Sequence, residues 1–207
     1  MADYENPVTT SKANLNGTAL QRHLRFFSRS TTQTDLIYPW EIYASFRALG
    51  FNTLISLVSV LDFTVHVGYP TSEDLVPIGW VVKGCPVNAK NIARAKHGSD
   101  TGSYDRNGEF DEASFERIWK FDMDKKGGLF FSEIIKMCVA NRNVFDVAGF
   151  LFQLFLWGSL WLLAADEEGV LRMEDVRRQY DGSLFYEIEE RRRKGERLPL
   201  WRGGALW

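Results

Sequence analysis

Imidazole side chains are scarce in this sequence, and two of its three histidines stand where they could do chemistry. Leu20, His23, Leu24 and Phe27 have the spacing that places four side chains on one face of a helix. His23 therefore points toward an apolar interior, where it serves either as a ligand or as a hydrogen-bonded core residue. His97 lies in a Lys-His-Gly-Ser-Asp turn, which suits a second ligand, an acid–base group or a residue that organises the loop.

A second group of chemistry-bearing residues has the spacing of a calcium-binding loop. An EF-hand loop carries oxygen ligands at positions 1, 3, 5, 7, 9 and 12 and a glycine at position 6. Residues 122–133 read DMDKKGGLFFSE, so Asp122, Asp124 and Glu133 take positions 1, 3 and 12. Position 5 is Lys126, which offers no oxygen and adds a positive charge. The spacing predicts the fold of a hand, and the lysine favours a structural loop over a weak calcium site.

An earlier segment, residues 28–41, has the form of a degenerate hand. It is rich in serine and threonine, and no register supplies several carboxylates. Glu41 takes position 12 when the loop is counted back from the helix that follows. Since hard cations need several oxygen ligands, we expect little calcium binding here.

Two long apolar segments must position these residues. Residues 49–69 contain Asp62 and His66, and polar groups are costly in lipid, so we expect a buried or interfacial helix rather than a membrane span. His66 is expected to be structural. Residues 147–165 are apolar and rich in aromatic side chains, with Gln153 among the few polar groups. This segment has the length of a transmembrane helix, and it equally suits the central helix of an aromatic-lined pocket.

Composition and length favour one domain. The chain has 207 residues, 45% of them hydrophobic, and a net charge of −2, which provides no overall field to attract nucleic acid. We expect a flexible polar tail over residues 1–17, without a signal peptide, and a single mainly α-helical domain over residues 18–190. In that domain EF-hand-like helix–loop–helix units pack against the two apolar helices. Residues 191–207 form a basic tail that either contacts anionic lipid headgroups or is a solvated helix end.

Four segments of the sequence resemble the caleosin family. They occur in the family's order, with an apolar segment after the second and another before the last, over about residues 19–190. The segments read ALQRHLRFF, IYPWEIYASFRALG, KHGSDTGSYD with NGEFD, and RMEDVRRQYDGSLFYEIEE. The sequence is identified as a member of this family, of the fungal type.

The resemblance implies a haem b enzyme that takes oxygen from a fatty acid or other hydroperoxide. It transfers that oxygen to an apolar acceptor, by epoxidation or hydroxylation, at or near a lipid surface. The two family histidines tied to haem fall on His23 and His97. We therefore expect His23 to be the axial ligand, and His97 to be a second haem-associated residue that either dissociates or assists cleavage of the O–O bond. The resemblance also implies calcium binding, for which Asp122, Asp124 and Glu133 are weak candidates and Glu41 is a degenerate one.

The sequence is consistent with more than one cellular location and more than one function. The family resemblance implies the cytosolic face of lipid droplets or of the endoplasmic reticulum, while a soluble cytoplasmic protein is also consistent with the sequence. The same scaffold also suits a non-enzymatic lipid-droplet surface protein, or a haem-independent tailoring or cyclising enzyme of fungal secondary metabolism. The visible spectrum of the purified protein separates these functions, because only the haem enzyme has a Soret band that depends on His23.

Overall fold

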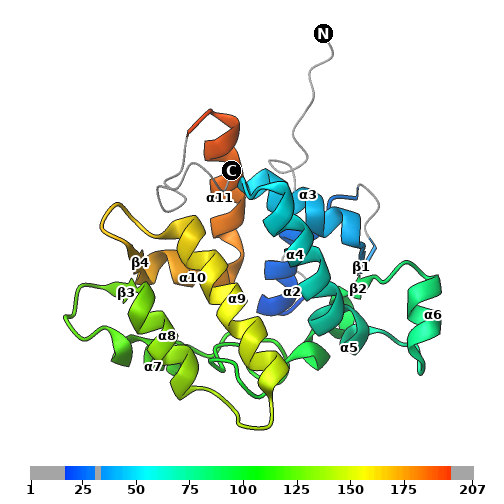
Figure 1. Ribbon diagram of the computed structural model, residues 1–207, viewed down its shortest axis with the longest axis horizontal. Coiled ribbons are helices and arrows are strands. Elements are labelled where there is room, and N and C mark those ends of the chain that lie inside the picture. Colours follow the sequence, from blue (N-terminus) through cyan, green and yellow to red (C-terminus); the bar gives the residue numbers. More distant parts are fainter. Residues whose placement is uncertain (1–16, 31–33, 197–207) are drawn as a thin grey trace.

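A computed structural model describes residues 17–30 and 34–196 of the chain. Within these ranges the protein is mainly α-helical with a few very short strands, which confirms the predicted fold class (Figure 1). The predicted polar tail, apart from its last residue, and the basic tail beyond residue 196 lie outside the described residues.

The first half of the chain forms helix–loop–helix units joined by a short antiparallel sheet. Strand β1 (Leu36–Ile37) pairs with β2 (Val87–Asn88), and Ile37 lies opposite Val87. The helices of this half are α2 (Ala19–Leu24), the 3-10 turn η1 (Arg25–Phe27), α3 (Pro39–Leu49), α4 (Thr53–Phe63), the π-helix η2 (Thr64–Gly68), α5 (Tyr69–Thr71), α6 (Pro77–Val82) and the 3-10 helix η3 (Ala89–Ala95).

One expectation for this half needs correction. The segment 49–69 is not one helix, because Gly50 adopts a left-handed conformation with φ of 100° that ends α3, and Asn52 then caps α4. The following segment, residues 69–96, contains α5, α6, β2 and η3.

The second half also consists of helix–loop–helix units joined by a short antiparallel sheet. It comprises α7 (Glu112–Ile118), the 3-10 turn η4 (Trp119–Phe121), β3 (Gly128–Phe130), α8 (Phe131–Ala140), α9 (Val147–Ala164), β4 (Val170–Arg172), α10 (Met173–Asp181) and α11 (Ser183–Arg193). Strand β3 pairs with β4, and Leu129 lies opposite Leu171. Leu129 is position 8 of the predicted loop 122–133, so Leu171 has the same position in a matching loop, residues 164–175. This second loop was not predicted from the sequence.

Capping side chains fix where the helices that carry the site begin. Thr18 accepts a hydrogen bond from the backbone N–H of Gln21, and the Gln21 side chain accepts one from the backbone N–H of Thr18. Asp111 caps α7, and Asp146 caps α9 through the backbone N–H of Gly149.

The two halves lie side by side and meet along α2, α9 and α11 (Figure 1). Helix α10 packs against α2, α11 packs against α3, and α9 packs against both α8 and η2. One continuous set of buried side chains runs through both halves. The molecule is therefore a single packed unit whose interior is built from both halves of the chain.

Candidate active site

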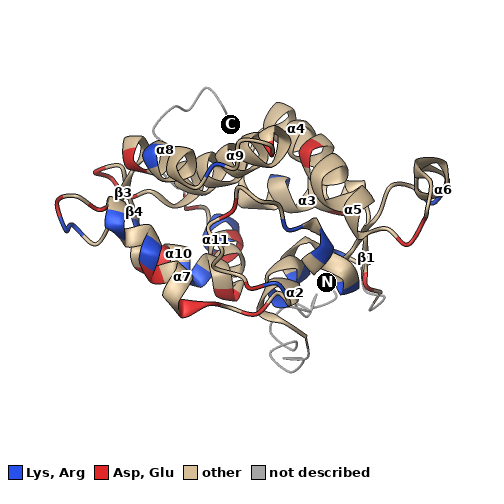
Figure 2. Cartoon of the chain, turned by 90° about the horizontal axis from the view of Figure 1, so that it is seen from below, with Lys and Arg blue, Asp and Glu red and all other residues tan. Residues whose placement is uncertain are grey.

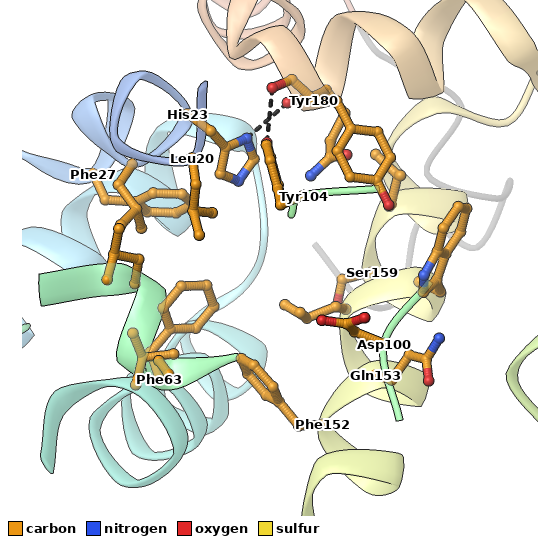
Figure 3. Close-up of a pocket in the computed structure, with 18 of the residues that line it drawn as sticks. Leu20, His23, Phe27, Phe63, Asp100, Tyr104, Phe152, Gln153, Ser159 and Tyr180 are labelled. Atoms are coloured by element: carbon orange, nitrogen blue, oxygen red, sulfur yellow. Dashed lines mark hydrogen bonds between the residues drawn. The ribbon is translucent and has the colours of Figure 1, made fainter. Parts of the chain in front are cut away.

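An apolar cavity of about 210 Å³ lies where the two halves meet. Its walls come from α2, from α4 and η2, from the loop after η3, and from α9, α10 and α11. Most of its lining is aliphatic or aromatic. Figure 3 shows His23 on one side of this space and α9, with Gln153 and Ser159, on the other. Both predicted site histidines, His23 and His97, line this same cavity.

His23 is arranged as a neutral imidazole with one nitrogen fixed and the other directed to the cavity. Its Nδ1 lies 2.7 Å from the carbonyl oxygen of Gln179, and a carbonyl can only accept, so Nδ1 carries the proton and donates it. Burial lowers the pKa of His23 to about 4, although the Gln179 carbonyl opposes this shift. The unprotonated Nε2 turns toward the open space (Figure 3), and no hydrogen bond to it is found among the described residues.

The contact that holds His23 depends on Gly182, the residue between α10 and α11. Gly182 has φ of 83°, and a Cβ built there would lie 3.1 Å from the Cα of His23. A glycine is therefore needed both for the left-handed turn and for the close approach of α2. This approach brings the Gln179 carbonyl within reach of the imidazole, so the Asp-Gly turn of the last motif directly supports the first one.

His97 is held by a carboxylate that the sequence analysis did not single out. Asp146 Oδ2 lies 3.2 Å from His97 Nδ1 and accepts the backbone N–H of Ser99 at 2.9 Å. Partial burial opposes ionisation of Asp146, but hydrogen bonds from Ser99 and Gly149 outweigh it and hold the pKa of this carboxyl below its ordinary value. Asp146 is thus an anion that caps α9 and fixes the ring of His97, leaving Nε2 for other partners.

The aromatic wall is narrower than the sequence suggested. Of the aromatic side chains of α9, Phe152 and Trp157 line the cavity and are buried, whereas Phe150, Phe155 and Trp161 do not line it. His66 lies outside the cavity lining. Its Nδ1 is 3.0 Å from Asp62 Oδ1 and its ring stacks on Phe152, so this histidine supports the wall from behind.

The loop of residues 122–133 holds a lysine ammonium where a hand would hold its metal. Lys126 Nζ lies 3.0 Å from Asp122 Oδ1 and 2.7 Å from Glu133 Oε2, so the carboxylates of positions 1 and 12 both face it. Burial acts against these charges, but the mutual hydrogen bonds dominate: the pKa of Lys126 is raised and the pKa values of Asp122 and Glu133 are lowered. Asp124 is exposed and is not among the partners of Lys126.

The matching loop 164–175 is closed in a similar way by an arginine. Arg172 pairs with Asp166 and Glu168 and donates to the carbonyl of Lys126 at 2.9 Å, which ties the two loops together. Lys126 and Arg172 therefore each pair with two carboxylates of their own loop.

Glu41 is likewise occupied by the protein itself. It is fully buried, and its Oε1 accepts the backbone N–H groups of Arg29 and Ser30 while its Oε2 accepts that of Tyr38. Within residues 17–30 and 34–196, no group of three His, Cys, Asp or Glu side chains is arranged to hold a metal ion. The residues of both predicted loops do not fit calcium in this arrangement.

The donor chemistry of His23, in contrast, fits the axial ligand of a haem. A metal-binding imidazole usually donates its other N–H to a carbonyl or carboxylate, which fixes the tautomer and the ring. His23 meets this requirement through Gln179. The volume of the cavity is below the 300–1,000 Å³ of typical ligand pockets.

Comparison with known proteins identifies the family. The model of the caleosin family, described as caleosin related protein, matches residues 15–189. The chain belongs to the caleosin family. No solved structure matches this caleosin chain.

Curated relatives of this caleosin include proteins named as enzymes. It is 35% identical to a peroxygenase of Lilium longiflorum over 86% of this chain and 72% of the relative. It is also 35% identical to probable peroxygenase 4 of Arabidopsis thaliana, over 84% of this chain and 86% of the relative. A probable inactive peroxygenase-like protein of Arabidopsis thaliana is 31% identical over 80% of this chain and 78% of the relative. These similarities support an oxidoreductase of the peroxygenase type.

Proposed function

We propose that this caleosin is a haem-dependent peroxygenase that transfers oxygen from a lipid or other apolar hydroperoxide to an apolar acceptor. One observation carries the proposal: His23 presents an unprotonated Nε2 to an apolar cavity while its Nδ1–H is fixed on the Gln179 carbonyl. A buried imidazole that stays neutral throughout the physiological pH range is ready to bind iron, because a proton never competes for its lone pair.

The residues of the chain divide the remaining work. Haem, when bound, would supply the redox chemistry that oxygen transfer from a hydroperoxide needs. His23, on α2, would hold the iron of the bound haem. His97, with Nδ1 fixed by Asp146, has Nε2 available to take up or return the proton of the hydroperoxide. The walls, including Phe63 and Phe152, exclude water and select an apolar substrate (Figure 3).

The visible spectrum of the full-length protein expressed with ample haem tests this proposal. We expect a Soret band that is lost in His23→Ala and kept in the matched control His66→Gln, because His66 lies outside the cavity lining. Oxygen transfer from a fatty acid hydroperoxide should require the Soret-absorbing form. A protein that stays colourless with haem present, or a band that survives His23→Ala unchanged, contradicts the proposal.

We further propose that the enzyme works against a lipid surface. Two helical stretches, Thr53–Thr71 and Val147–Ala164, are long and apolar enough to cross a membrane, which alone is weak evidence. More specific support comes from two sets of exposed apolar side chains, one along a single face of α4 and η2 and the other on residues 75–82, which include α6. They are Leu54, Leu57, Val58, Leu61, Val65, Leu75, Val76, Ile78, Val81 and Val82.

This apolar surface carries few charges. Figure 2 shows α4 and α9 almost entirely free of charged residues, while Lys, Arg, Asp and Glu gather on β4, α10 and α11. Exposed apolar surface of this extent marks contacts with membranes or other apolar partners. Because α4 and α9 also supply walls of the cavity, a lipid surface on their outer faces lies next to the site.

A further inference from the structure

One polar side chain of the cavity wall has no polar partner. Gln153 is 3% exposed, lines the cavity from α9, and forms no hydrogen bond through either Oε1 or Nε2 within the part of the chain that the structure describes. Figure 3 shows it on α9, across the cavity from His23. Its nearest neighbours in the lining on α9, Phe152, Leu156 and Trp157, are apolar or aromatic.

An unpartnered amide in this position opposes folding. A buried donor or acceptor without a partner loses its hydrogen bonds to water and regains nothing, whereas a leucine of similar size would gain contacts. The great majority of buried polar groups in native proteins are paired, so an exception calls for a ligand or a catalytic role. Gln153 is therefore explained by what enters the cavity rather than by packing.

The chemistry of a carboxamide narrows the class of ligand group. Its oxygen accepts and its nitrogen donates, so it complements a group that offers one O–H and one acceptor oxygen side by side. A hydroperoxide or hydroxyl group meets this description and is neutral. A carboxylate lacks the donor, and burying its charge in an apolar wall is far more costly.

We propose that Gln153 binds the hydroperoxide group of the apolar substrate, with the O–H donating to Oε1 and Nε2–H donating to a peroxide oxygen. This assignment rests on the proposed peroxygenase function for the identity of the substrate. Gln153, on the wall opposite His23, would determine which part of an otherwise uniform hydrocarbon chain binds in the cavity.

Binding measurements on the full-length protein, independent of turnover, test the assignment. The probes are the methyl ester of a medium-chain fatty acid and the same ester with one secondary hydroxyl, which stands in for the hydroperoxide. Quenching of tryptophan fluorescence reports binding because Trp157 lines the cavity. We expect the wild-type protein to prefer the hydroxylated ester about tenfold, the contribution of one or two neutral hydrogen bonds.

The decisive variant is Gln153→Leu, with Gln153→Met as a second form should the first fold poorly. Both are expected to bind the two esters equally and to unfold at the same temperature as the wild type or higher. The control Leu160→Met changes the same wall without removing a polar group and keeps the preference. A preference that persists in both Gln153 variants, or its absence in the wild type because water satisfies the amide, overturns the assignment.

This assay separates the two proposals. A Gln153-dependent preference in a protein that never transfers oxygen, even with haem, refutes the proposed function and leaves the binding role of Gln153 standing. Haem-dependent oxygen transfer without that preference refutes the role of Gln153 alone.

Discussion

Replacing Lys126 with methionine is expected to destabilise the protein and to create a calcium site. The ammonium group lies within 3.0 Å of both Asp122 and Glu133, and the three side chains are only 15%, 7% and 7% exposed. Methionine keeps most of the packing but leaves two shielded carboxylates without a counter-charge. Removing one partner of a buried ion pair costs roughly 3–5 kcal/mol. Because these side chains have partial access to water, we expect the free energy of unfolding of Lys126→Met to fall by about 3 kcal/mol.

Urea unfolding at neutral pH and low salt measures this loss. The matched control is Lys125→Met, which removes the neighbouring lysine, an exposed residue outside the ion pairs of the loop, and is expected to change stability by no more than about 0.5 kcal/mol. Excess calcium should restore about 2.7 kcal/mol to Lys126→Met once its concentration reaches roughly 100 times the dissociation constant. The same calcium should leave the wild-type transition unmoved, because Lys126 already fills the position.

Acid provides an independent check on the cause. The pKa values of Asp122 and Glu133 are lowered in the folded wild type, so their contribution is present above the ordinary carboxyl pKa and is lost as pH falls through the lowered one. In Lys126→Met the two carboxylates repel each other, and protonation removes this repulsion. The difference in the free energy of unfolding between the variant and the wild type should therefore become smaller in acid. A variant as stable as the wild type, or a wild type that binds calcium as tightly as the variant, would refute this account.

Three further outcomes are expected. Since the unfolded chain protonates His23 below pH 6.5 but the folded protein only near pH 4, stability should fall by about 3 kcal/mol between these values and stay flatter in His23→Phe, as urea titrations at several pH values would reveal. Gly149→Ala would place a Cβ 2.5 Å from His97 Nδ1, so oxygen transfer should drop about 10- to 100-fold while the Soret band persists; unchanged turnover would argue against a role for the fixed ring. The double variant Leu57→Asp with Leu61→Asp removes two exposed leucines, which are 54% and 66% accessible. It should reduce binding to phosphatidylcholine vesicles by about 100-fold or more in a flotation assay. Equal flotation of variant and wild type would exclude this face as the lipid contact.

Local patterns were sufficient for the helix that carries His23. The periodicity of Leu20, His23, Leu24 and Phe27 places the imidazole on the inner face, and the cap at Thr18 fixes the start of that face. The hand-like loop was also predictable, and so was the conflict at its fifth position, because both depend only on spacing and charge. The structure adds that the ammonium of Lys126 reaches both carboxylates.

Long-range partners were not predictable from such patterns. Asp146 is 49 residues away from His97 in sequence, and nothing in its own surroundings distinguishes it from a helix cap. The loop 164–175 was missed because alanine stands at its first position. Asp166, Gly169 and Leu171 at positions 3, 6 and 8 were the available signal. The break at Gly50 was overlooked because hydropathy continues across it.

The hydrogen bond between His23 and the Gln179 carbonyl has a mechanical consequence. It joins α2 from the first half of the chain to α10 from the second, and the close contact of Gly182 with α2 reinforces the same seam. If the cavity widens to admit a large ligand, this contact between α2 and α10 must act as the hinge. The two halves then separate on the side of η2 and α9. Separation of α2 from α10 would instead break the hydrogen bond to the Gln179 carbonyl. The His23 proton could then lie on either ring nitrogen, and the ring would no longer have one fixed tautomer.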